Sequence, residues 1–180
     1  MYSVKAKIVG VDPGLLMHKY SDQAQAEASK VTKKSGRQVC SAEDEAEQGA
    51  YRLESGELCQ PAEHIYQAMC KAASDFQVKG KGKKTYKGVV AGNVVVTPEF
   101  IGHGRNSYAI DARPARIQRA RIMRRRPLLR DWSLEFDIQV LDEELLPKEV
   151  LSAVLVKAGE SVGIGDYRPR FGRFIVSEFN

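Results

Sequence analysis

The sequence is poor in cysteine, and this excludes two common ways of stabilising a small protein. Its three cysteines, Cys40, Cys59 and Cys70, are odd in number and show no Cys-x-x-Cys spacing. Neither a disulfide framework nor a zinc site is therefore expected. Free thiols are typical of a reducing compartment, so we expect a cytoplasmic protein.

Long apolar runs are missing as well. No stretch is long and apolar enough to span a membrane, and the N-terminal residues enter an alternating pattern without the apolar centre of a signal peptide. No internal repeat of solenoid length is present. We expect a soluble protein with no membrane partner.

Residues at spacings typical of a catalytic or metal site are also lacking. His18, His103 and Asp22 could act as acid or base, but none has a partner at a suitable spacing. We expect His18 to be packed after its apolar neighbours, and His64 to be exposed in a first helical turn. The acidic residues within 43–47 are consecutive rather than spaced for a metal. We therefore expect no catalytic residue, no metal and no cofactor.

What the chain does contain is clustered positive charge. The net charge is +5, with eight arginines from Arg113 to Arg130 and five lysines from Lys79 to Lys87. Such clusters favour nucleic acid or another anionic partner. Two alternatives are a solvated face and a patch that pairs with the acidic run at 43–47.

The length of 180 residues and 43% hydrophobic content suit one domain, with excursions at about 12–60 and 79–115. Apolar periodicity predicts six main elements. They are strands at 2–9, 89–96 and 132–140, helices opened by Pro61 and Pro147, and a short, buried final strand at 174–179. Among the remaining segments we expect a loop at 100–112, a strand at 115–123 and a basic turn at 124–127.

This order predicts an α+β fold with a ferredoxin-like, RNA-recognition-like βαββαβ palm. In such a fold the helices cover one face of the sheet and leave the other open. Lys5 and Lys7 would lie on the open face, opposite Val4, Ala6 and Ile8. Binders of single-stranded RNA use an open face of this kind.

The segment from Val162 to Phe174 stands between the second helix and the last strand. Gly163, Gly165 and Gly172 permit positive φ and close approach of another backbone, and the arginines between them offer guanidinium forks. One interpretation is a loop that follows a phosphodiester strand. The other is a glycine-capped helix end with an ordinary turn.

This glycine-rich loop, within that order of elements, resembles the RAMP superfamily (repeat-associated mysterious proteins) of CRISPR-associated proteins. The matching residues are Gly163, Gly165, Gly172, Arg173 and Phe174, with looser matches at 15–18 and 61–64. The resemblance is to the backbone subunits that bind guide RNA. It implies contacts with RNA and assembly into a filament. The chain also looks like small phage proteins with a similar terminal signature.

We therefore expect a non-catalytic protein that binds single-stranded nucleic acid, RNA preferred, and self-associates along the strand. Its partners would be copies of itself and other CRISPR-like subunits. Alternatives are a phage-encoded interaction or assembly protein and a RAMP-type RNA endonuclease. Bases could stack on Tyr86, Tyr167 or Phe171. The predicted nucleic-acid-binding residues are Lys5, Lys7, Lys81, Lys83, Lys84, Arg116, Arg119, Arg121, Arg124, Arg125, Arg126, Gly163, Gly165, Tyr167, Arg168, Arg170, Gly172 and Arg173.

Overall fold

Alternation of apolar and polar residues builds the centre of the main sheet in the computed structural model, which describes residues 1–19, 41–117 and 120–180. Strand β1 (Tyr2–Gly10) pairs antiparallel with β8 (Ser133–Val140), so that Val4 lies opposite Ile138 and Ile8 opposite Leu134. These side chains are buried, whereas the residues between them face the other side. The two strands expected at 2–9 and 132–140 are confirmed.

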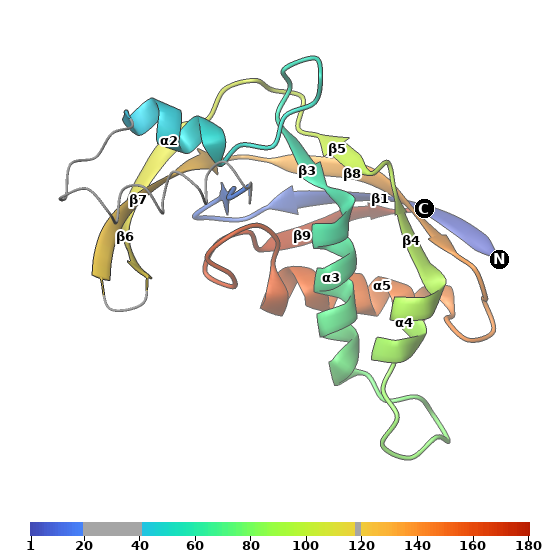
Figure 1. Ribbon diagram of the computed structural model, residues 1–180. Helices are drawn as coiled ribbons and strands as arrows, with labels where there is room; N and C mark the ends of the chain where they lie inside the picture. Colours follow the sequence, from blue (N-terminus) through green and yellow to red (C-terminus); the bar gives the residue numbers. More distant parts are fainter. Residues whose placement is uncertain (20–40, 118–119) are drawn as a thin grey trace.

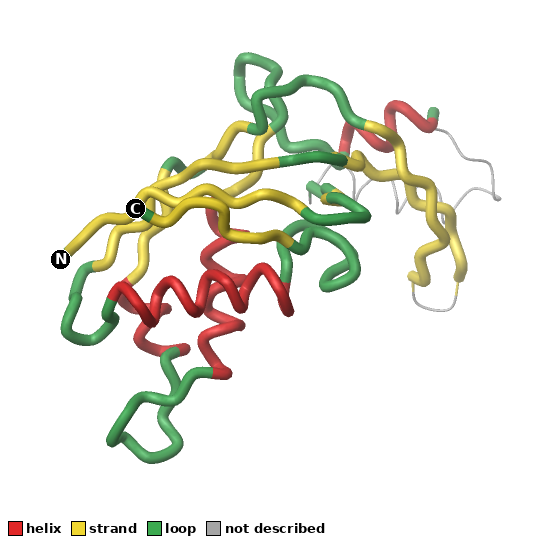
Figure 2. The backbone as a smooth tube through the Cα atoms, turned by 180° about the vertical axis from the view of Figure 1, so that it is seen from behind, coloured by secondary structure: helices red, strands yellow, loops and turns green. Residues whose placement is uncertain are grey.

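The main sheet has four antiparallel strands in the order β4-β8-β1-β9 (Figure 1). Its outer strands are β4 (Val94–Thr97) and β9 (Phe174–Phe179). The helices that cover it are α3 (Ala62–Ala72), α4 (Lys87–Asn93) and α5 (Lys148–Lys157), with a short turn η1 (Ala73–Asp75) after α3 and a π-helical turn η2 (Ala158–Val162) after α5. All three helices lie on one face of the sheet, as both views show (Figure 2). The expected α+β class and single helical layer are confirmed.

A long hairpin extends the molecule beyond the main sheet. It consists of β6 (Ala109–Ile117) and β7 (Ala120–Leu129), and it projects at the end opposite the termini (Figures 1 and 2). Strand β2 (Leu15–Leu16) pairs with the base of β7, and α2 (Ala42–Gln48) packs against it. Strands β3 (Cys59–Pro61) and β5 (Phe100–Gly102) form a separate small pair.

The basic turn predicted at 124–127 is wrong, because these residues continue strand β7. Nor is 115–123 a single strand, because it contains parts of both β6 and β7. Residues 100–112, expected as a loop, include β5 and the start of β6. The arginines of β7 are held in extended conformation by pairing with β6 and by ion pairs to Glu45 and Asp166. These two carboxylates are far away in the sequence, so the local pattern does not predict the strand.

Two further predictions differ from the structure. Residues 87–93, expected to be mostly strand, form α4, because Val90 and Asn93 are buried at helical spacing and the helix packs on α3. Tertiary packing here overrides the strand preference of valine. The final strand is an edge strand and not a buried one, and Ile175 is 57% exposed. Within the described ranges, no helix has the length and apolar character needed to cross a bilayer.

Candidate functional site

The loop at 163–173, here called the glycine loop, is fixed by backbone hydrogen bonds to the segment that follows β1. The amide of Asp166 donates to the carbonyl of Leu16 at 2.8 Å, and the amide of Gly172 donates to that of Gly14 at 2.8 Å. Within the loop, Ile164 donates to the carbonyl of Gly172 at 2.9 Å. The loop therefore has a defined backbone, although it lacks regular secondary structure.

The three glycines allow the chain to approach itself. Gly163, Gly165 and Gly172 all have φ between 71° and 76°. A Cβ atom at Gly165 would lie 2.5 Å from the carbonyl oxygen of Leu16, and one at Gly172 would overlap that of Ile164. Gly163 also ends the π-helical turn η2. The close approach predicted from the sequence is therefore present, and the backbone that approaches is the protein's own.

The arginines of the glycine loop reach solvent. Arg168, Arg170 and Arg173 are all exposed. Among the described residues, none of the three has an ion-pair partner within 4.0 Å. Their guanidinium groups are therefore available to an external anion without the loss of an internal contact.

An ion pair and two cation–π contacts, the longer one from Arg113 to Tyr167 at 6.0 Å, join the β6–β7 hairpin to the glycine loop. The Nε atom of Arg126, a residue only 8% exposed, lies 2.6 Å from Oδ2 of Asp166. The guanidinium of Arg113 lies over the ring of Phe171, 4.5 Å from its centroid. Phe171 is fully buried, so the prediction that it could stack on a base is wrong, whereas Tyr167 is 48% exposed.

The other predicted arginines of the hairpin have mixed surroundings. Arg124 and Arg125 lie 3.9 Å and 3.1 Å from the carboxylate of Glu45, so part of the acidic run pairs with them inside the chain. Arg121 is exposed. Arg116 belongs to β6, opposite Arg121, and Arg119 lies outside the described residues.

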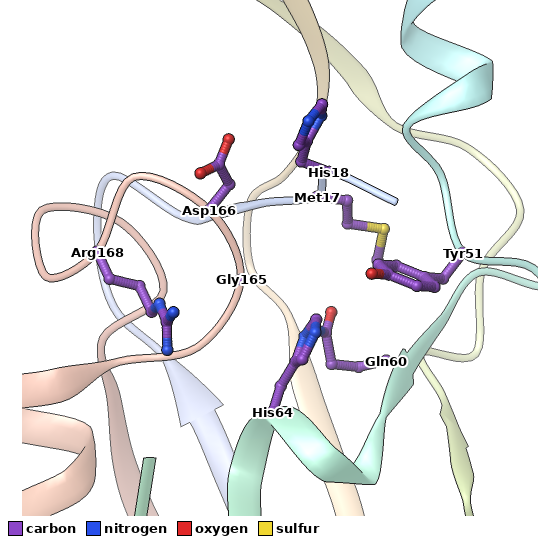
Figure 3. Close-up of a pocket in the computed structure, with 8 residues that line it drawn as sticks. All are labelled: Met17, His18, Tyr51, Gln60, His64, Gly165, Asp166 and Arg168. Carbon is purple, nitrogen blue, oxygen red and sulfur yellow. The ribbon is translucent and has the colours of Figure 1, made fainter. Parts of the chain in front are cut away.

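Beside the glycine loop is a polar cavity of about 280 Å³ (Figure 3). It is lined by Met17, His18, Tyr51, Gln60, His64, Gly165, Asp166 and Arg168. Three segments therefore meet at the cavity: the end of β2, the start of α3 and the glycine loop. These are the segments on which the resemblance in the sequence rests. The sequence analysis missed Tyr51 and Gln60, since nothing in their spacing relates them to the loop, and it did not single out Asp166 within the loop itself.

Desolvation sets the protonation of the two imidazoles at the cavity. Burial, and then the charge of Arg168, lower the pKa of His64, while partial desolvation of a ring that keeps exposed surface is the main cause that lowers the pKa of His18. Both rings are therefore neutral near pH 7. His18 is exposed and His64 is half-buried, so both sequence expectations for these residues are wrong. The reason is that His18 follows the last buried residue of its run, whereas Tyr51 and Gln60 cover His64.

The predicted lysines lie away from this site. Lys5 and Lys7 are on the open face of the main sheet, where Lys7 pairs with Glu135 at 2.7 Å and Asp137 lies opposite Lys5 in the register. The loop between η1 and α4 carries Lys81, Lys83 and Lys84, all exposed. Both views place that loop on the helical side, far from the β6–β7 hairpin (Figures 1 and 2).

His103, another acid–base candidate, does not line the cavity. The ring nitrogens of His103 are buried, and the ring packs edge-on against Trp132 with centroids 6.2 Å apart. Asp22 lies outside the described residues. Across the described part of the chain, no group of three or more His, Cys, Asp or Glu side chains could hold a metal ion.

A scan against models of protein families finds no match to this chain. A search of curated protein sequences likewise finds no match. The function proposed below therefore rests on the sequence pattern and on the geometry of the site.

The close approach inside the glycine loop predicts a large cost for Gly172→Ala. The added methyl group would overlap the carbonyl of Ile164 in a left-handed conformation, so we expect a loss of about 3 kcal/mol or more in unfolding free energy. Gly104→Ala is the control, because Gly104 has φ of 67° but no atom within 4 Å, and should cost about 1 kcal/mol. Equal losses in urea titrations would show that the loop backbones do not pack closely.

Burial of His103 predicts acid sensitivity. Desolvation, and then Arg105, lower the pKa of His103 to about 4, so it stays neutral in the folded state while its unfolded form gains a proton below about pH 6.5. Stability should therefore fall between pH 6.5 and 4, by up to about 3 kcal/mol from this residue. His103→Gln should flatten the curve of unfolding free energy against pH more than His18→Asn does, because the pKa of His18 is lowered less. Parallel curves for wild type and His103→Gln would contradict the assignment.

Proposed function

We propose that this chain is a non-catalytic protein that binds single-stranded nucleic acid, RNA preferred, and self-associates along the strand. This function resembles that of the guide-RNA-binding backbone subunits of the RAMP superfamily. The observation that supports it best is the set of three exposed arginines on the glycine loop, which form no ion pair with any residue that the structure describes. Guanidinium forks are well suited to phosphate groups, and each retained contact favours binding.

The fixed backbone of the glycine loop strengthens this argument. Hydrogen bonds to Leu16 and Gly14 hold the loop in place before any ligand arrives. Only the arginine side chains would then have to be ordered on binding, which lowers the entropic cost. Tyr167, half exposed beside these arginines, offers a ring on which a base can stack.

The arrangement of the main sheet is consistent with this family. The order β4-β8-β1-β9, with α3 between β1 and β4 and α5 between β8 and β9, suits a ferredoxin-like βαββαβ palm. The glycine loop follows α5 and precedes the last strand, as the family resemblance requires. The fold therefore supports the proposal independently of the arginines.

We place the strand along the glycine loop and the β6–β7 hairpin. On the open sheet face, Lys5 and Lys7 meet the carboxylates of Glu135, Asp137 and Glu178, so this face carries no excess of positive charge. The hairpin, in contrast, presents exposed Arg121 on an element joined to the loop by the Arg126–Asp166 ion pair. For self-association, Glu43 and Asp44 remain exposed on α2 and can meet the arginines of a neighbouring copy.

The proposal predicts how binding depends on salt. If Arg168, Arg170 and Arg173 each contact a phosphate, changing all three to Ala should reduce the slope of log K against log salt by about 2, at about 0.7 per contact. Fluorescence anisotropy of labelled single-stranded RNA and DNA of equal sequence gives this slope.

The matched control for that measurement is Lys81→Ala/Lys83→Ala/Lys84→Ala, which removes the same charge from a distant loop. It should reduce the slope less than the arginine variant does. An equal reduction by both variants would indicate an effect of net charge alone. No RNA binding by folded wild type would favour the alternative of an interaction or assembly protein.

A RAMP-type RNA endonuclease is the second candidate, because His18 and His64 line one cavity with Arg168. Neutral imidazoles can accept a proton from a 2′-hydroxyl group. We predict no cleavage of labelled RNA, with or without magnesium, after prolonged incubation with wild type. Cleavage that disappears in both His18→Ala and His64→Ala would instead establish the enzyme.

A further inference from the structure

The cavity contains a buried hydrogen-bond acceptor that has no donor. Gln60 lies on β3 and is fully buried, and its Oε1 atom has no hydrogen-bond partner among the residues that the structure describes. A buried amide oxygen without a partner costs about 1–3 kcal/mol. Such a group, at the wall of a polar cavity, can recognise a ligand that brings an N–H donor.

The orientation of the Gln60 amide follows from its neighbour. Its Nε2 atom contacts Nδ1 of His64, and this ring is neutral because burial and Arg168 lower its pKa. With the ring proton on Nε2, Nδ1 accepts from the Gln60 amide, and Oε1 is turned away from the ring. Figure 3 shows this oxygen directed into the space that His18, Tyr51 and His64 surround.

The walls of the cavity suit a flat, aromatic ligand. The rings of Tyr51 and His64 both line the cavity and pack edge to face, at 84° with centroids 5.6 Å apart, so together they form an aromatic wall for a flat ring. Met17 adds a soft apolar surface. Exposed Arg168 provides the positive charge at this site.

An inorganic anion suits the interior less well than a base does. The unpartnered oxygen of Gln60 would repel an anion, and the two imidazoles are neutral. An anion would therefore be held at Arg168, and a neutral ring with an amino group would fill the interior.

We propose that the cavity binds one unstacked nucleobase whose exocyclic amino group, as in adenine or cytosine, donates to Oε1 of Gln60. Arg168 would contact the adjacent phosphate. This inference rests on the proposed function and adds base selectivity at one position of the strand. Uracil has a carbonyl where cytosine has its amino group, and its N3–H donor lies between two carbonyls, so uracil would bring an acceptor close to Oε1.

The test uses uridine strands of about twelve nucleotides that carry one central adenosine or one purine ribonucleoside, which lacks only the amino group. Anisotropy should show about tenfold tighter binding of the adenosine strand to wild type. Gln60→Leu should remove this difference and leave the affinity for the purine strand unchanged. Gln67→Leu, at an exposed position on α3, the helix that follows β3, should retain it.

Equal affinities for the two strands with wild type, or a preference that survives Gln60→Leu, would overturn the inference while leaving strand binding intact. If wild type binds no RNA, the proposed function fails, and the cavity is tested by itself. Adenosine monophosphate, but not purine ribonucleoside monophosphate, should then shift the side-chain amide resonance of Gln60 in NMR titrations. No shift with adenosine monophosphate would overturn the inference.

Discussion

The site depends on one constraint, the close contact between the backbone of the glycine loop and the segment after β1. Gly172 reaches Gly14, and Asp166 reaches Leu16, at hydrogen-bonding distance. A side chain at Gly165 or Gly172 would prevent this contact. Because β2 also pairs with β7, the same contact brings the arginine-rich hairpin beside the loop. The cavity and the exposed arginines both follow from this arrangement.

Much of the fold could be predicted where the information is local. The alternation in β1 and β8 and the apolar stripe of α5 each specify one buried face, and these elements agree with the sequence prediction. The prediction failed at α4 and β7, whose conformations depend on distant partners. Val90 packs on another helix, and Arg125 and Arg126 pair with carboxylates far away in sequence. Single-sequence patterns do not contain such partners.

The site could be predicted only in part, for the same reason. The glycines and arginines of the last loop stand close together in the sequence, and the structure keeps them together. The cavity needs Tyr51, Gln60 and His64 from another region, and only the tertiary fold brings them to the loop. Exposure was also misjudged, since His18 is exposed and His64 half-buried. The lysines predicted to bind nucleic acid lie on the open sheet face and in the loop before α4, and their role remains a prediction. A cluster of charges in the sequence does not reveal whether it shares a surface with the arginines of the glycine loop.

The most direct test of the account is photo-crosslinking of single-stranded RNA that contains 4-thiouridine, followed by identification of the attached residue by mass spectrometry. The account predicts attachment within the glycine loop, at exposed Tyr167 or its neighbours. This attachment should weaken when Arg168, Arg170 and Arg173 are replaced. Attachment confined to Tyr86 and the lysine loop, with none at the glycine loop, would contradict the central claim.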